Sequence, residues 1–409
     1  MTTETLRADR DFRLYWTART VSAAGSLTTM IAMPVLIYRL TGSASLTALT
    51  TALEALPYLV FGLLAGALTD RWNRQRVMVA ADVANAAVIF SVPLLWWLGH
   101  LTVAHVLVAA FVVQSLFTFF DGANFGALPV LVGSERIGAA NSAIFGVGGV
   151  LDLLMPAAVG LLLVVWSPAT ILAIDAVSFA VSAVLVRSIR RPLSLPRDRT
   201  GPTRARHVLA DVREGVGFLL RHKGVRTTTA VGTLQSIAGA AFMSLAVVFS
   251  DRALHIGTSG WRFGLLYSAW GVGGIGAAAI TPRLLQVASP AKAVTWAIPL
   301  SGLAGVLVAL SPSWTVALIC MVVWGVAYQV VLIASLTYRQ RVTPETMLGR
   351  VNTAARMLSW GVGWTVGSLG ASALARAVDV RAAMATLTCA GLLAAVLAWV
   401  SPLRSQVEA

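Results

Sequence analysis

The stretch ALPYLVFGLLAGALTDRWNRQRVMVAADVANAAVIFSVPLLWWL, Ala55 to Leu98, holds two apolar runs on either side of a short basic loop. An α-helix needs about 20 predominantly apolar residues to cross the hydrocarbon of a bilayer, and each run is close to that length. The strands of a membrane barrel would be about ten residues long with strict alternation, which neither run shows. The stretch therefore predicts two transmembrane helices joined by a loop on one face of the membrane.

The same pattern continues along the 409 residues, of which 57% are hydrophobic and only 12% are charged. Soluble domains average about 25% charged residues, and a soluble protein of this length could not cover so much apolar surface. We therefore expect an all-α membrane protein with twelve transmembrane helices. The predicted spans are Leu14–Leu40, Leu46–Leu68, Val77–Leu98, Val103–Phe125, Ala139–Val165, Pro168–Val186, Thr227–Phe249, Phe263–Ile280, Ala293–Leu310, Trp314–Thr337, Leu348–Ala375 and Ala382–Val400.

The basic residues, which give a net charge of +14, are concentrated in alternate loops. If the N-terminus is inside, the outer loops hold only Arg39, Arg252, Arg262, Arg376 and Arg381. The positive-inside rule then places both termini in the cytoplasm and the chain in the plasma membrane, the inner membrane of a cell with two. Because topology explains the charge, no nucleic-acid partner is expected. The charged start runs straight into a long apolar span, so no cleavable signal peptide is expected either.

The longest polar stretch, from Arg187 to about Arg226, divides the predicted spans six and six. Its first part, RRPLSLPRDRTGPTRAR, is typical of a solvated linker. Its second part, HVLADVREGVGFLLRHKG, has apolar residues at helical spacing, which predicts an amphipathic helix. That helix would lie either on the cytoplasmic membrane surface or against the helical bundle.

The two halves of the chain also resemble each other. VGSERIGAANS (132–142) is similar to VTPETMLGRVNT (342–353), and each segment enters the fifth predicted span of its half. Duplicated halves are typical of secondary transporters. We therefore expect two pseudo-symmetric six-helix bundles, 1–187 and 227–409, which are joined by a cytoplasmic linker with an amphipathic helix, 188–226.

The loop between the second and third spans reads GALTDRWNRQRV, Gly66 to Val77. It closely resembles the signature loop of the major facilitator superfamily, with Gly66, Asp70, Arg71 and Arg74 at matching positions. Asn73 stands where the usual residue is glycine, and asparagine also accepts left-handed backbone angles. A glycine lets neighbouring helices approach closely, and Asp70 can face a helix N-terminus or Arg74. The loop is thus expected to form a latch that closes the inner side.

Further segments resemble the drug-exporter branch of that superfamily, which includes macrolide and siderophore efflux proteins. They are LYWTARTVSAAGS, ALPYLVFGLLAGALTDR, AANSAIFG, IDAVSFAVSA and LGRVNTAARMLSWG. The resemblance implies a monomeric secondary transporter that exports hydrophobic or amphipathic small molecules by alternating access, driven by proton entry. A lysophospholipid flippase or a solute importer of the same fold stays open, as does a membrane receptor or scaffold outside transport.

Ionisable residues inside the predicted spans are the candidates for proton coupling or substrate binding. Such a residue costs about 2.5–3.5 kcal/mol on insertion scales, so it needs a compensating role. The candidates are Glu54, Asp152, Asp121, Arg356 and Arg19. Each has a structural alternative: Glu54 could pair with Arg19, Asp121 could be a contact at a helix end, and Arg356 could neutralise a carboxylate. Asp82 and Asp175 are interpreted as structural because they lie near the ends of spans.

Aromatic and amide side chains in the spans are candidates for lining a broad binding cavity. They are Tyr58, Gln235, Trp324, Tyr328, Gln329 and Trp360. The sequence GVGGIG, Gly271 to Gly276, has the spacing of a dinucleotide-binding loop but lies inside an apolar span, where packing glycines are expected instead. No Walker loop, metal-ligand spacing or catalytic nucleophile motif is present, so we expect no cofactor, no metal and no enzymatic activity.

Overall fold

The computed structural model describes the chain apart from residues 1–5, 7, 70, 195–204, 345–346 and 405–409. The described residues are largely helical and contain no strand, which confirms the predicted all-α class. Eleven helices among them are long and apolar enough to cross a membrane. They are α2 (Arg10–Thr41), α3 (Ala44–Thr69), α4 (Arg74–Trp97), α5 (Val103–Val132), α6 (Ile137–Val165), α7 (Pro168–Arg187), α9 (Lys223–Val248), α10 (Trp261–Val287), α11 (Pro290–Leu310), α12 (Trp314–Val342) and α15 (Val380–Val400).

The remaining predicted span is present as three consecutive helical pieces. These are α13 (Leu348–Arg356), the π-helical turn η3 (Met357–Gly363) and α14 (Trp364–Leu374). Together residues 348–374 would extend about 40 Å at 1.5 Å per residue, which is enough to cross a bilayer. π turns inside α-helices occur mostly at functional sites, and this one bears on the cavity described below.

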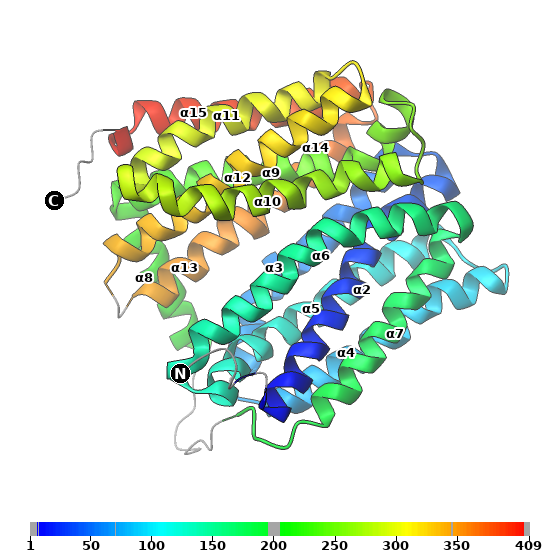
Figure 1. Ribbon diagram of the computed structural model, residues 1–409, viewed down its shortest axis with the longest axis horizontal. Helices are drawn as coiled ribbons and strands as arrows, with labels where there is room; N and C mark the ends of the chain where they lie inside the picture. Colours follow the sequence, from blue (N-terminus) through cyan, green and yellow to red (C-terminus); the bar gives the residue numbers. More distant parts are fainter. Residues whose placement is uncertain (1–5, 7, 70, 195–204, 345–346, 405–409) are drawn as a thin grey trace.

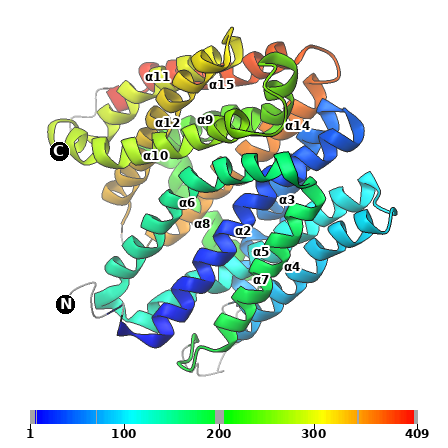
Figure 2. The same ribbon diagram turned by 45° about the vertical axis from the view of Figure 1, so that its right-hand side comes forward.

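The helices form two groups, α2–α7 and α9–α15, which Figure 1 shows as the lower and upper parts of the molecule. In the first group α7 packs against α2 and α4, and in the second α12 packs against α10 and α11. The groups meet where α6 packs against α10 and where α3 packs against α14. The view in Figure 2 shows the same division into two groups.

Glycines set the closest approach between the two groups. A Cβ atom built on Gly264 of α10 would lie only 2.6 Å from the backbone oxygen of Pro156 on α6. One built on Gly271 would lie 2.7 Å from the backbone oxygen of Asp152. On another face of α10, Gly273 meets Gly325 of α12 in the same way. Two glycines of the GVGGIG segment thus act as packing residues.

The apolar core is distributed unequally along the molecule. At the end that holds Thr41 and Gly260, here called the closed end, one continuous core includes Leu36 of α2 and Phe263 of α10. At the opposite end, here called the N-terminal end, Phe12 and Leu219 belong to two separate cores, one on each side. Among the described residues, the core that contains side chains of both groups therefore extends from the closed end, and the two cores at the N-terminal end each belong to one side.

The signature loop lies at the N-terminal end. Asn73 adopts φ −66° and ψ 110° and caps α4 by accepting a hydrogen bond from the Arg76 amide, so its backbone is extended rather than left-handed. Arg74 donates to the carbonyl of Gly126 on α5 at 2.8 Å. Gly66 lies within α3 and Arg71 in the exposed turn, whereas Asp70 lies outside the described residues. The latch expected between Asp70 and Arg74 therefore stays a prediction.

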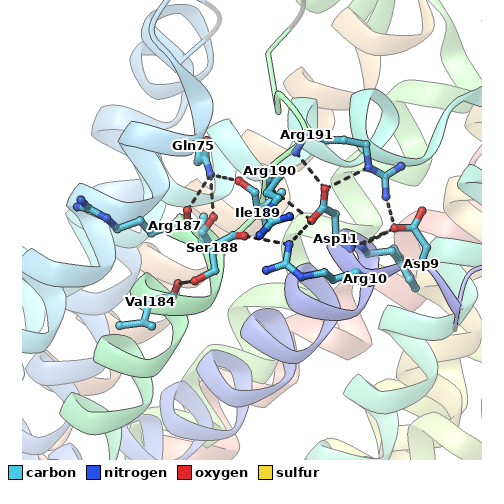
Figure 3. A network of polar contacts seen from close by, with 12 residues as sticks. Asp9, Arg10, Asp11, Gln75, Val184, Arg187, Ser188, Ile189, Arg190 and Arg191 are labelled. Carbon is cyan, nitrogen blue, oxygen red and sulfur yellow. Dashed lines mark hydrogen bonds and ion pairs between the residues drawn. The ribbon is translucent and has the colours of Figure 1, made fainter.

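Next to this loop, the segment after α7 is fastened to the start of α2 and to α4 (Figure 3). Arg191 forms ion pairs with Asp9 and Asp11, and the amide of Gln75 donates to the carbonyls of Val186 and Ile189 at 2.9 Å each. The N-terminal ends of α2 and α4 and the C-terminal end of α7 are thereby held together as one unit.

The predicted amphipathic helix is present as α8 (Ala205–Arg221). It packs against α13, where Glu214 forms an ion pair with Arg350 and Gly215 lies against the Arg350 backbone. Leu219 is buried in the core of the second group. Of the two alternatives left by the sequence, packing on the bundle is the one observed.

Candidate functional site: a cavity between the two helix groups

A cavity of about 520 Å³ lies between the two groups. Its wall comes from α2, α3, α5, α6 and α7 on one side, and from α9, α10 and the helical run 348–374 on the other. The structure brings together seven of the residues singled out from the sequence: Arg19, Glu54, Tyr58, Asp121, Asp152, Arg356 and Trp360. The cavity thus gathers all five charged candidates, which lie far apart in the chain.

Glu54 of α3 and Asp152 of α6 both belong to the first helix group, and both line the cavity that faces the second group. The Oε1 atom of Glu54 is buried and has no hydrogen-bond partner among the described residues. The buried phenol of Tyr267, which comes from α10 of the opposite group, lines the same cavity. Asp152 is exposed to the cavity, at the level where its backbone contacts Gly271 of α10. Neither carboxylate forms an ion pair within the described part of the chain, so the pairing of Glu54 with Arg19 is not observed.

The charged groups nearer the N-terminal end include both arginines. The guanidinium of Arg356 lies over the ring of Tyr58 at 5.8 Å, and that of Arg19 lies over Phe120 at 5.4 Å. The negative charge of Asp121 acts on Tyr58 as well. Tyr58 follows Glu54 by one turn along α3. The cavity therefore changes from purely acidic at its deep part to mixed charge toward the N-terminal end.

Apolar side chains make up most of the remaining wall. Trp360 and Trp364 are stacked with ring centroids 5.7 Å apart and an angle of 7° between the rings. Met30 and Met243 contribute flexible thioether side chains from opposite groups. Flat aromatic faces and adaptable methionines suit apolar molecules of varied shape.

Four residues expected in the cavity do not line it. Trp324 is buried against Phe242 and Trp270, and Tyr328 is buried next to Trp270. The amide of Gln235 donates to the carbonyl of Tyr328 at 3.0 Å. Gln329 lies near Gly274 of α10. These side chains join α9, α10 and α12 to one another, because they lie on helix faces that point into the second group rather than toward the first.

Three cavity residues were missed or misinterpreted in the sequence. Asp175 is fully buried in the middle of α7, where it accepts hydrogen bonds from Thr29 at 2.5 Å and Ser178 at 2.8 Å, so placing it near a span end was wrong. Tyr267 and Trp364 also line the cavity. In the sequence, Tyr267 and Trp364 look like any other residue of an apolar helix. Only the way α10 and α14 pack shows that these two side chains line the cavity.

The cavity is sealed toward the closed end by polar contacts between the groups. Tyr38 donates to Asp251 at 2.7 Å, and Arg252 donates to the carbonyl of Gly42 at 2.5 Å. Ser45 of α3 and Ser372 of α14 are hydrogen-bonded at 3.0 Å. The hydrogen bonds that join α2–α7 to α9–α15 within the described ranges all lie at this end.

Comparison with known proteins gives a consistent picture. Residues 15–359 match the family model described as Major Facilitator Superfamily. Macrolide efflux protein A of Streptococcus pyogenes is 28% identical over 54% of this chain and 54% of its own length, so the match spans about half of that relative. The multidrug efflux pump Tap of Mycolicibacterium fortuitum is 27% identical over 93% of each chain. The enterobactin exporter EntS of Shigella boydii serotype 4 is 27% identical over 90% of this chain and 86% of its own.

Solved structures show the same fold at lower sequence identity. A variant of the nucleoside transporter NupG superimposes with a TM-score of 0.73 at 13% identity, covering 98% of this chain and 100% of that one. A bacterial homologue of the iron transporter ferroportin, in an inward-facing state, gives a TM-score of 0.73 at 15% identity, covering 95% and 98%.

Proposed function

Because this chain belongs to the major facilitator superfamily, we propose that it exports hydrophobic or amphipathic small molecules across the plasma membrane, driven by protons that enter. One observation carries the proposal: Glu54, whose Oε1 has no hydrogen-bond partner among the described residues, and Asp152, which is exposed to the cavity, both lie in an aromatic and apolar cavity between the two helix groups. The full-length similarity to a multidrug pump and a siderophore exporter supports export of drug-like or siderophore-like molecules.

The direction of opening follows from loop charge. The positive-inside rule assigns the N-terminal end and both termini to the cytoplasm, since most Lys and Arg of the loops lie there. The hydrogen bonds and the continuous core at the closed end then make this an inward-facing conformation. The moving bodies are residues 1–187 and 227–409, with the linker 188–226 between them.

In this mechanism Glu54 and Asp152 alternate between binding a proton and binding substrate. A carboxylate that is buried without a partner is costly as an anion, so it favours either protonation or a cationic substrate group. Protons that arrive from outside release the substrate, and their loss to the cytoplasm resets the site. Arg19, Asp121 and Arg356, at the wider part of the cavity, orient polar groups of the substrate, while Tyr58 and Trp360 contact its apolar body. The proposed transporter acts as a monomer, each chain carrying its own cavity.

The test is reconstitution of the purified protein in liposomes with an imposed pH gradient and a panel of macrolides, other antibiotics and siderophores. Gradient-driven movement of at least one compound is expected, and Glu54→Gln or Asp152→Asn should abolish it while insertion is unchanged. Glu135→Gln, at an exposed position in the short 3-10 helix between α5 and α6, is the matched control. Movement of no compound by the wild-type protein would overturn the proposed export. Wild-type rates in both variants would remove the two carboxylates from the mechanism.

A further inference from the structure

A second polar cluster lies behind the cavity wall, between α4 and α7. Asp82 and Asn85 are one turn apart on α4, and Ser182 of α7 lies next to Asp82. All three are almost completely inaccessible, with exposures of 1%, 0% and 0%. None of them lines the cavity.

The polar atoms of this cluster are unsatisfied. Both carboxylate oxygens of Asp82, both terminal atoms of the Asn85 amide and the Ser182 hydroxyl lack a hydrogen bond of good geometry in the described structure, although the Ser182 side chain lies within reach of the Asp82 carboxylate. A buried polar atom without a partner costs about 1–3 kcal/mol, and a charged one costs more. Four of these five atoms are oxygens, which one ligand could satisfy together.

The charges around Asp82 also leave one negative charge in excess. Arg19 and Asp175 are the charged groups that act on Asp82, and both lie on the cavity wall. Arg19 makes no ion pair with Asp82 and instead lies over Phe120. If both carboxyl groups are ionised, they oppose the single positive charge of Arg19. One additional positive charge would balance the cluster.

We propose that Asp82, Asn85 and Ser182 bind one Na⁺ ion behind the cavity wall. Hard cations take oxygen ligands, and this cluster offers carboxylate, amide and hydroxyl oxygens that are otherwise unused. A single carboxylate matches a monovalent ion better than a divalent one. A proton on Asp82 supplies one donor and can satisfy one further oxygen, whereas a cation can be bound by the carboxylate, the Asn85 amide oxygen and the Ser182 hydroxyl together. The ion reaches the cluster from the cavity, past Arg19 and Asp175.

Thermal unfolding of the full-length protein in detergent tests this site without a transport assay. NaCl is titrated at constant ionic strength against N-methyl-D-glucamine chloride, with KCl as a second comparison. Because a ligand that binds only the folded state stabilises it, the midpoint should rise saturably with Na⁺ and less with K⁺. In Asn85→Ala and Ser182→Ala, the apparent Na⁺ affinity should fall about tenfold or more.

Ser268→Ala is the matched control, because Ser268 is a buried serine without a partner on α10, in the other helix group. It should keep the wild-type Na⁺ response. The proposal is overturned if Na⁺ stabilises the protein no more than N-methyl-D-glucamine does, or if all three variants respond alike. Stabilisation that follows pH and is indifferent to Na⁺ would also overturn it, and would assign the cluster to a proton. These outcomes are independent of whether the protein exports any compound.

Discussion

Tyr38 on α2 donates a hydrogen bond to Asp251 on the π turn η2 (Phe249–Ala253) at 2.7 Å, which ties the two helix groups together across the closed end. Arg252 supports this contact by donating to the same tyrosine hydroxyl at 3.1 Å. The Tyr38–Asp251 hydrogen bond joins one group to the other and is not part of the packing within either group. Its strength therefore contributes to the balance between the closed and open forms of this end.

Removing that hydrogen bond should shift the balance toward opening. Hydrogen bonds to charged groups contribute about 1.5–3 kcal/mol, so Tyr38→Phe should raise the open population at this end by about tenfold or more. The measurement is the labelling rate of a cysteine at Ser259, in a background without Cys320 and Cys389, by a membrane-impermeant maleimide. Thr41→Val is the control, because the Thr41 hydroxyl donates within its own helix. Equal labelling in both variants would show that the contact does not hold the end closed.

A larger residue at the crossing of α6 and α10 should oppose closure of the same end by a steric clash. Gly264→Val places a side chain where a Cβ already comes 2.6 Å from the Pro156 carbonyl oxygen, so the closed end can no longer close. Transport should be lost while the amount of inserted protein stays near normal. Gly274→Ala, on the same helix, meets only Gln329 at 3.8 Å and should transport normally. Full activity in Gly264→Val would mean that α6 and α10 need not approach this closely.

Replacing Trp360 should affect substrate binding, whereas replacing Trp324 should affect the stability of the fold. Trp360 is 47% exposed on the cavity wall, so Trp360→Ala should weaken substrate binding and change the unfolding midpoint little. Trp324 is 1% exposed in the core, and Trp324→Ala should cost about 3–5 kcal/mol of stability. Fluorescence titration and thermal unfolding measure the two quantities. If both variants bind substrate as tightly as the wild type, the aromatic wall is not part of the substrate site.

The ion pair of Arg191 with Asp9 should make stability depend on acid pH. Burial raises the pKa of Asp9, but hydrogen bonds from Arg191 and from the amides of Phe12 and Asp11 outweigh it and leave the pKa below its ordinary 3.8. Because the folded pKa is lower, this stabilisation is complete above about pH 3.8 and is lost as the pH falls through the folded pKa. The midpoint difference between wild type and Arg191→Ala should therefore shrink on acidification below pH 4.

Arg190→Ala is the control for that series, since the Arg190 side chain is exposed and only its backbone contacts Asp11. It should differ little from wild type at every pH. A gap between Arg191→Ala and wild type that stays constant down to pH 3 would assign the role of Arg191 to its other contact, the Leu131 carbonyl.

The fold was predictable because a bilayer permits few structures. Apolar runs long enough to span it form transmembrane helices, and a basic loop such as the one around Arg74 joins two of them on one face. Intramembrane charges such as Glu54 and Asp152 were found because their insertion cost marks them. The uncharged residues of the cavity wall were not predictable, since Trp324 and Trp364 both lie in apolar stretches of the sequence that contain glycine. Which of them faces the cavity depends on the rotation of each helix, which packing glycines such as Gly264 determine.

The central claim is that the two helix groups rock about the cavity, and spin-label distances measure this most directly. One pair of labels, at Thr41 and Ser259, spans the closed end, and the other, at Arg76 and Arg283, spans the N-terminal end. On acidification or addition of a transported compound, the first distance should lengthen while the second shortens. Two distances that stay fixed, or that change in the same direction, under conditions that support transport would contradict the account.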